Sequence, residues 1–366
     1  MTDYLSHIKQ KLAERKAENA LRTLKINTDL IDFCSNDYLG LAKEKAIHQN
    51  ANTLEQYGAT GSRLISGNHT ITIETEQFLA NFYQAESALI FNSGYNANLG
   101  LFSCLPQRGD TVIYDELIHA SIRDGMRLSN AHSYSFGHND VIALEKKLQK
   151  AKGNIYVVVE SIYSMDGDEA PLKEIARICK KHNAALIVDE AHAVGLFGKN
   201  GSGLVTEYSL ENEVFARVVT FGKAMGCHGA AVLGNQELRS YLINYSRPFI
   251  YTTALPLPSI QVIKNAHHFI TNNTDRNNTL KTLITYFKQQ ALNINYNIID
   301  SNSAIQCIIV SGNDNVKKLT TTIQKAGFDV RPILYPTIPK GEERIRICLH
   351  TFNTPKQIEN LIALIK

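Results

Sequence analysis

Six short apolar runs between positions 87 and 234 most strongly constrain how this chain can fold. None of them alternates apolar with polar residues, as a strand with one solvated face would. Helical patterns separate several of the runs, at 117–130, 140–151 and 172–183. Strands buried on both faces and separated by helices predict an α/β fold with a mostly parallel sheet. The runs are SALIF (87–91), TVIY (111–114), IYVVVE (155–160), AALIVD (184–189), ARVVT (216–220) and GAAVLG (229–234).

The two ends of the chain follow different patterns. Residues 4–24 read as an amphipathic helix, and the proline-rich stretch 254–259 marks a boundary. Strand candidates follow at 304–310 and 344–350, and the last helix begins after the N-cap candidate Thr354. We therefore expect three parts: an N-terminal helix and link (1–35), a large α/β domain (36–255) and a small α+β domain (256–366).

The composition is that of an ordinary globular protein. Hydrophobic residues make up 44% of the 366 residues, and the formal net charge of +3 gives no reason to expect nucleic acid or a membrane surface as partner. The polar N-terminus shows no secretory signal, and no apolar run reaches the ~20 residues of a spanning helix. The six scattered cysteines include no CxxC pair, which favours reduced thiols in a cytoplasmic protein.

Polar and ionisable residues follow five of the predicted strands. Ligands of open α/β sheets bind at the carboxyl ends of the strands, so these residues form the candidate site. The segments are Asn92–Tyr95, Asp115–His119, Glu160–Asp166, Asp189–His192 and Thr220–Lys223.

Two nucleotide-binding classes are disfavoured. Asp189–His192 reads DEAH, a tetrad also found in nucleotide-driven helicases, but neither Gly-Lys pair of the chain fits the phosphate loop GxxxxGK[ST]. The dinucleotide fingerprint GxGxxG is missing as well. The remaining histidines, including His267 and His268, lack metal-ligand spacing, so no metal is expected.

Pyridoxal 5'-phosphate (PLP) chemistry fits the same residues. A lysine such as Lys223 can form a Schiff base with the cofactor aldehyde, and a carboxylate such as Asp189 can keep the pyridine nitrogen protonated. The helix-opening turn Ser93–Tyr95 offers backbone N–H groups to a phosphate. His119 can stack on the ring.

The motifs along nearly the whole chain resemble the α-oxoamine synthase family of fold-type I PLP-dependent transferases. That resemblance implies a large, mostly parallel sheet domain and a smaller α+β domain formed by the C-terminal part with the N-terminal helix. The matching segments are IKQKLAERKAENALR (8–22), SNDYLGLA (35–42), YGATGSRLISGN (57–68), NSGYNAN (92–98), HAS (119–121), FGHND (136–140), SMDGDEAPL (164–172), VDEAHAVGLFG (188–198), TFGKAMG (220–226), YTTALP (251–256) and RIRICLHTFNTP (344–355).

The resemblance also implies roles for single residues. Lys223 matches the lysine that binds PLP covalently, Asp189 the partner of the pyridine nitrogen, and His119 the residue stacked on the ring. Residues matching positions near the phenolic oxygen are Ser164 and His192, and those at the phosphate are Gly94, Tyr95 and Thr220. The substrate-contacting positions are Arg22, Thr337 and Arg346, with Arg346 on the amino-acid carboxylate. The family forms homodimers in which Thr252 or Thr253 reaches the partner's phosphate.

The activity implied is a decarboxylative condensation of an amino acid with an acyl thioester. GSRL (61–64) and ALR (20–22) favour L-alanine with a pimeloyl thioester of CoA or acyl carrier protein, a step of biotin biosynthesis. Alternatives are glycine with acetyl-CoA or succinyl-CoA, serine with a long acyl chain, and a non-catalytic subunit of this fold, against which Lys223 argues. Thr72, Thr75 and Asn353 depart from the usual family residues, which leaves acyl-chain recognition open.

Overall fold

The computed structural model describes residues 4–24, 26, 29–51 and 56–366, which form two compact units. Unit 2 consists of residues 36–164 and 169–278, and unit 1 consists of residues up to 35, 165–168 and 279–366. Unit 2 runs past the expected boundary at 255, because helix α10 (Leu257–Asn272) packs on α2 (Thr70–Phe82) of the same unit.

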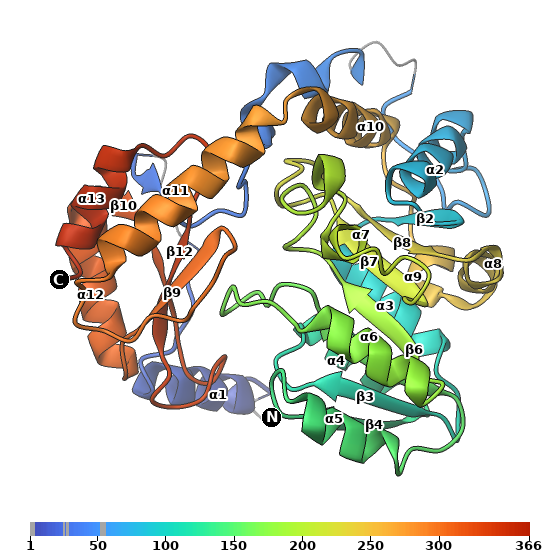
Figure 1. Cartoon of the computed structure of the whole chain (residues 1–366), viewed down its shortest axis with the longest axis horizontal. Coiled ribbons are helices and arrows are strands. Elements are labelled where there is room, and N and C mark those ends of the chain that lie inside the picture. The colour runs from blue at the N-terminus through green and yellow to red at the C-terminus, as the bar shows by residue number, and fades with distance from the viewer. Residues whose placement is uncertain (1–3, 25, 27–28, 52–55) are drawn as a thin grey trace. The chain divides into compact units, whose positions relative to one another are not determined.

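Unit 2 is built around a seven-stranded sheet with the strand order β2-β8-β7-β6-β5-β3-β4 (Figure 1). β8 runs antiparallel to both of its neighbours and every other pairing is parallel, which confirms the predicted mostly parallel sheet. The strands are β2 (Ser87–Phe91), β3 (Thr111–Asp115), β4 (His132–Phe136), β5 (Ile155–Glu160), β6 (Ala185–Asp189), β7 (Ala216–Thr220) and β8 (Ala230–Gly234).

Edge strand β4 has no counterpart among the six predicted strands. Its sequence HSYSF is exposed except at Phe136, so it lacks the apolar run that marks the other strands. The outermost position of β4 explains this composition, because one long edge of the strand has no neighbour in the sheet.

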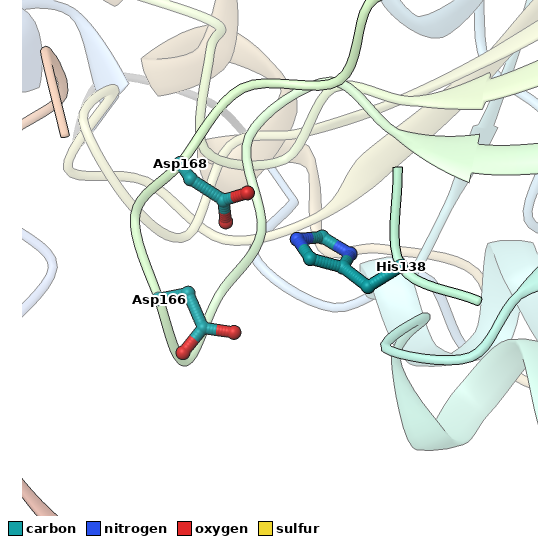
Figure 2. Close-up of side chains that lie close together, drawn as sticks. All are labelled: His138, Asp166 and Asp168. Carbon is teal, nitrogen blue, oxygen red and sulfur yellow. The ribbon is translucent and has the colours of Figure 1, made fainter. Parts of the chain in front are cut away.

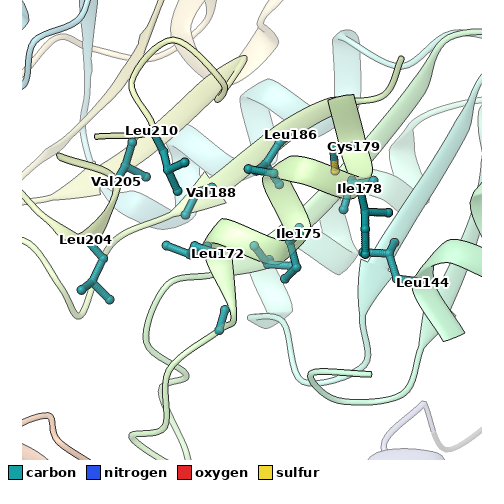
Figure 3. Close-up of a cluster of buried hydrophobic side chains, with 14 of the residues drawn as sticks. Leu144, Leu172, Ile175, Ile178, Cys179, Leu186, Val188, Leu204, Val205 and Leu210 are labelled. Atoms are coloured by element: carbon teal, nitrogen blue, oxygen red, sulfur yellow. The ribbon is translucent and has the colours of Figure 1, made fainter. Parts of the chain in front are cut away.

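Two apolar clusters cover the two faces of the sheet. One packs α5 (Val141–Leu148), α6 (Leu172–Lys181) and α7 (Leu204–Glu207) on the sheet, as Figure 3 shows for Ile175, Leu186 and their neighbours. The other packs α3 (Gly94–Cys104), α4 (Ala120–Leu128), α8 (Gln236–Tyr245) and α9 (Arg247–Ile250) on the opposite face. Shorter helices of unit 2 are η1 (Leu41–Lys43), η2 (Lys45–His48) and η4 (Lys199–Gly201).

Unit 1 joins the N-terminal residues to the C-terminal part of the chain. β1 (Ile31–Asp32) pairs in parallel with β10 (Phe328–Asp329), and an antiparallel sheet has the order β11-β12-β9. The strands of that sheet are β9 (Ile305–Ile309), β11 (Arg331–Ile333) and β12 (Arg344–Cys348). The helices are α1 (Ser6–Ala17), α11 (Asp275–Ala291, in unit 1 from Thr279), α12 (Asn313–Lys325) and α13 (Pro355–Ala363).

Of two predictions about helices, the N-cap of the last helix is confirmed and the length of the first helix is wrong. The predicted N-cap at Thr354 is confirmed, because its side chain accepts from the backbone of Gln357 in a capping box. The predicted helix 4–24 is wrong in length, since α1 ends at Ala17 and Asn19 takes a left-handed conformation (φ 49°). No described helix combines the length and apolar character needed to cross a bilayer.

A cavity in the apolar cluster under α6 should strongly reduce the stability of the protein. Replacing the fully buried Ile175 by alanine should lower the free energy of unfolding by about 2–5 kcal/mol, measured by urea denaturation followed by circular dichroism. The exposed Arg177 on the same helix provides the control, because R177A should change stability by less than about 0.5 kcal/mol. Equal effects of I175A and R177A would contradict this assignment of the core.

Candidate active site

The carboxyl ends of β5, β6 and β7 bring three polar side chains to one face of the sheet. Glu160 lies opposite Asp189 in the register of the parallel β5–β6 pair, and Thr220 ends β7. Successive side chains of a strand point to opposite faces. Val158, Ile187 and Val218, each two positions earlier, belong to the cluster on the α3–α4 face. Glu160, Asp189 and Thr220 therefore point toward α3 and α4 as well.

Asp189 is buried and held by well-placed donors. Its Oδ2 accepts a hydrogen bond of 2.7 Å from Asn98 Nδ2 of α3, and its Oδ1 accepts one of 2.9 Å from the backbone N–H of Ala191. Asn98 Nδ2 also lies 3.1 Å from Ser121 Oγ of α4. The carboxylate thus has a fixed orientation at the end of β6.

His192 is buried and oriented by Tyr38. The Tyr38 hydroxyl lies 2.8 Å from His192 Nδ1 and 3.0 Å from Asn36 Oδ1, to which it donates. A hydroxyl has one proton, so a Tyr38 that donates to Asn36 accepts from Nδ1–H of His192. This arrangement selects the tautomer that leaves Nε2 of His192 as an acceptor.

Lys223 follows β7 in a tight loop. The loop is closed by hydrogen bonds from Phe221 N to Gly229 O (2.9 Å) and from Gly226 N to Lys223 O (2.8 Å). The half-buried ammonium of Lys223 acts electrostatically on both Glu160 and His119. Asp189 also acts on His119, so Lys223, Asp189 and His119 lie near one another.

The first turn of α3 lies beside Thr220. The N-cap Ser93 accepts from the backbone N–H of Asn96, and Gly94 and Tyr95 follow it. A Cβ added at Gly94 would lie 3.3 Å from Thr220 Oγ1, so any larger residue would crowd this corner. The N–H groups of a first helical turn have no intrahelical acceptors and favour an anion.

His119 is the N-cap of α4, and its Nδ1 lies 2.8 Å from Ser121 Oγ. Burial lowers the pKa of His119 below its usual value. The carboxylates of Asp189 and Asp124 raise this pKa, whereas the positive charge of Lys223 lowers it further. His119 is therefore neutral at neutral pH and can face an aromatic ring without a second positive charge.

Three more of the predicted site residues, Ser164, Thr252 and Thr253, belong to unit 2. Ser164 is half-buried on the loop after β5. Asn92 at the end of β2 donates to Thr252 Oγ1 (3.2 Å) and to the carbonyl oxygen of Thr253 (2.8 Å). Asn92 thereby fixes the segment that carries both threonines.

A buried ion pair between Glu190 and Arg217 adjoins the site. Glu190 follows Asp189, is fully buried, and accepts from Arg217 Nε at 2.8 Å. Arg217 also donates to the carbonyl oxygens of Tyr83 (2.7 Å) and Ser202 (2.6 Å). The pair ties the end of β6 to β7 and to two loops.

The predicted substrate residues belong to unit 1. Arg346 lies at the centre of β12, opposite Arg331 of β11, and its Nη1 lies 3.0 Å from Cys348 Sγ. Arg22 Nη2 donates to Thr337 Oγ1 at 3.1 Å, so these two predicted residues are in direct contact.

Residues 165–168, between β5 and α6, are also part of unit 1. Figure 2 shows Asp166 and Asp168 on this loop. Arg344 of β12 forms an ion pair with Asp166, and Ser301 donates to the carbonyl oxygen of Gly167 (2.7 Å). The loop that continues from Ser164 is thus anchored within unit 1.

The residues of unit 2 fit PLP. They offer a lysine for the aldehyde, a buried carboxylate for the pyridine nitrogen, and a helix N-terminus beside a threonine for the phosphate. Among the described residues, buried Asn98 Oδ1 and Glu160 Oε1 have no hydrogen-bond partner, as expected of a site built to receive a polar group.

Comparison with known proteins agrees with this geometry. Residues 28–365 match the family of class I and II aminotransferases. An 8-amino-7-oxononanoate synthase of Emericella nidulans is 40% identical over 96% of this chain and 93% of its own length. The chain is a PLP-dependent α-oxoamine synthase of the class I and II aminotransferase family. It is therefore an enzyme of the acyltransferase class with the fold-type I architecture.

Solved structures of this family superpose on nine tenths or more of the chain. Serine palmitoyltransferase of Sphingomonas wittichii has a TM-score of 0.93 and 29% identity, covering 100% of this chain and 97% of that chain. An 8-amino-7-oxononanoate synthase of Francisella tularensis has a TM-score of 0.80 and 29% identity, covering 92% and 96%. Similar structures of serine palmitoyltransferase contain PLP, the cofactor of this α-oxoamine synthase.

Three residues of the site have no individual role predicted from the sequence. Tyr38 orients His192, Asn98 orients Asp189, and Glu160 shares their sheet edge. Tyr38 and Asn98 lie in the quoted segments SNDYLGLA and NSGYNAN, but only the tertiary contacts reveal their partners.

Removing the Tyr38 hydroxyl should loosen His192. Y38F takes away a hydrogen bond worth about 1 kcal/mol, so PLP affinity should fall about fivefold, measured by PLP titration of the apoprotein. The exposed Tyr134 gives the control, and Y134F should leave PLP affinity unchanged. Unchanged affinity in Y38F would show that His192 does not depend on this contact.

Proposed function

We propose that the enzyme condenses L-alanine with a pimeloyl thioester, carried by CoA or acyl carrier protein, in biotin biosynthesis. The products are 8-amino-7-oxononanoate, the free thiol and CO2. A bond forms between the alanine Cα and the acyl carbonyl carbon, the C–S bond breaks, and the alanine carboxylate leaves as CO2. The free thiols of all six cysteines, each in the described part of the chain, agree with a cytoplasmic location.

The observation that carries this proposal is the convergence of Lys223, Asp189 and His119 at one sheet edge. It supports amino-acid chemistry at Cα, and the relatives named 8-amino-7-oxononanoate synthase support the choice of substrates. When bound, PLP supplies an aldehyde that takes up the amino group and a ring that withdraws electrons from Cα.

The residues of the chain have distinct tasks in this proposal. Lys223 holds the cofactor and, once released from it, moves the proton of the amino-acid Cα. Asp189, held by Asn98, keeps the pyridine nitrogen protonated. His192 and Ser164 bind near the phenolic oxygen, Gly94, Tyr95 and Thr220 bind the phosphate, and neutral His119 stacks on the ring.

For the substrate we propose residues of unit 1. Arg346 holds the amino-acid carboxylate, because a guanidinium binds a carboxylate through two parallel hydrogen bonds. Arg22 and Thr337, which contact each other, contribute further substrate contacts.

A second candidate is the condensation of serine with a long-chain acyl-CoA. The structural match to serine palmitoyltransferase, with a TM-score of 0.93, favours it specifically. Both reactions use the same residues at the sheet edge, so the choice between them depends on the acyl and amino-acid contacts.

A substrate panel distinguishes these reactions. The purified enzyme is given alanine, glycine or serine with pimeloyl-CoA, acetyl-CoA or palmitoyl-CoA, and thiol release is followed with mass spectrometry of the product. Alanine with pimeloyl-CoA should be the fastest pair, and K223A should lose turnover at least about 10³-fold together with the visible PLP absorbance. A fastest rate with serine and palmitoyl-CoA would overturn the proposed substrates but not the chemistry.

We further propose a homodimer in which Thr252 or Thr253 reaches the phosphate of the partner's site. Mixing K223A with the double variant T252A/T253A tests this arrangement. If the threonines act on the partner's site, each mixed dimer has one site with both defects and one intact site, so activity returns on mixing. If mixed dimers form and activity does not return, the threonines act within their own subunit.

A further inference from the structure

Glu160 is an unusual residue to end a buried strand. It closes the otherwise apolar run IYVVVE, its relative exposure is 3%, and its Oε1 has no hydrogen-bond partner among the described residues. A buried carboxyl without a full set of partners destabilises the fold, so a role at the site would account for it. The proposed function assigns it none.

The sheet directs Glu160 toward the residues that hold the cofactor. It lies opposite Asp189 in the parallel register, and both point to the face that carries α3 and α4. The backbone of His119 and that of Ser164 lie close to its carboxyl group, and Lys223 acts on it electrostatically. Three residues assigned to PLP thus surround Glu160 together with Asp189.

The charged groups that face Glu160 are few. Asp189 comes from β6 and Lys223 from the loop after β7. The uncharged Asn98 of α3 contacts Asp189, and His119 is the N-cap of α4. On the other neighbouring strand, β3, Asp115 follows two positions after Ile113 of the opposite cluster and so points to the other face.

This environment favours the protonated carboxyl. Burial and then the charge of Asp189 raise the pKa of Glu160 to about 8, against the opposing effect of Lys223. A protonated carboxyl is a hydrogen-bond donor, whereas a carboxylate only accepts.

We infer that Glu160 serves the Lys223 site as a neutral carboxylic acid, donates a hydrogen bond through its side chain to an oxygen of bound PLP, and sets the alkaline limit of cofactor binding when its proton is lost. The inference depends on PLP binding at Lys223 and Asp189 but on neither proposed substrate. A wrong substrate assignment would leave it intact.

The test compares PLP dissociation constants of the apoprotein across pH, with PLP itself as the probe. E160Q keeps a neutral donor at every pH, so the ratio of the wild-type constant to that of E160Q should stay near one at about pH 6. The ratio should rise about tenfold as pH passes about 8, because only the wild type loses its donor. E160A, which has no donor, should bind PLP about tenfold more weakly than E160Q at every pH.

The matched control is Glu169, a half-buried carboxyl on the same connection whose pKa is also raised by burial. E169Q should follow the wild-type pH curve. A ratio for E160Q that does not change with pH, or an equal change in E169Q, overturns the inference.

Protein stability gives a readout without cofactor. A carboxyl with a raised folded pKa stabilises the fold below its unfolded pKa of about 4.3, and this contribution is lost as pH rises to about 8. The Tm of E160Q, which cannot ionise, should therefore rise relative to the wild type between about pH 5 and pH 8 and then stay level. Parallel Tm curves would overturn the inference.

If E160Q does not fold, carbon-13 NMR of glutamate side chains in E169Q replaces it. One carboxyl signal should titrate near pH 8. Titration of every glutamate below about pH 6 would overturn the inference without a variant at position 160.

Discussion

The buried ion pair between Glu190 and Arg217 holds the framework on which the site depends. Asp189 is bonded directly to Glu190, so whatever fixes Glu190 also fixes the end of β6. Arg217 joins that carboxylate to the carbonyl groups of Tyr83 and Ser202, and Glu190 accepts in addition from the backbone of Val205. Breaking one half of a buried pair costs about 3–5 kcal/mol, because the other charge is left without a counterion. The fold and the position of the cofactor residues therefore have one anchor in common.

The periodicity of the sequence was sufficient to predict the main sheet and the edge that carries the site. Runs such as IYVVVE and ALIVD are apolar on both faces because helices cover both faces, and their parallel pairing puts Glu160 and Asp189 side by side. The same reasoning could not find β4, whose exposed residues lack an apolar pattern. The predicted helix is also longer than α1, since Ala20 and Leu21 continue its apolar pattern beyond the point where the left-handed Asn19 interrupts the helix.

The parts of the site that the sequence could not supply are contacts between distant residues. Tyr38 and His192 are 154 positions apart, and Asn98 and Asp189 are 91 positions apart. No local spacing encodes such pairs, because they arise only when α3 packs on the sheet and the segment around Tyr38 reaches His192. The roles of Arg22, Thr337 and Arg346 came from the family resemblance, and within unit 1 the contact between Arg22 and Thr337 joins two of them.

The two edge strands of the large sheet differ in their exposure to solvent. At one edge β2 is wholly buried, and helices α2 and α8 pack against it. At the other edge β4, also five residues long, presents His132, Ser133, Tyr134 and Ser135 to solvent. A short, polar edge strand is a poor template for a strand from another molecule. β4 can therefore complete the sheet and still protect a concentrated solution of this enzyme from edge-to-edge aggregation.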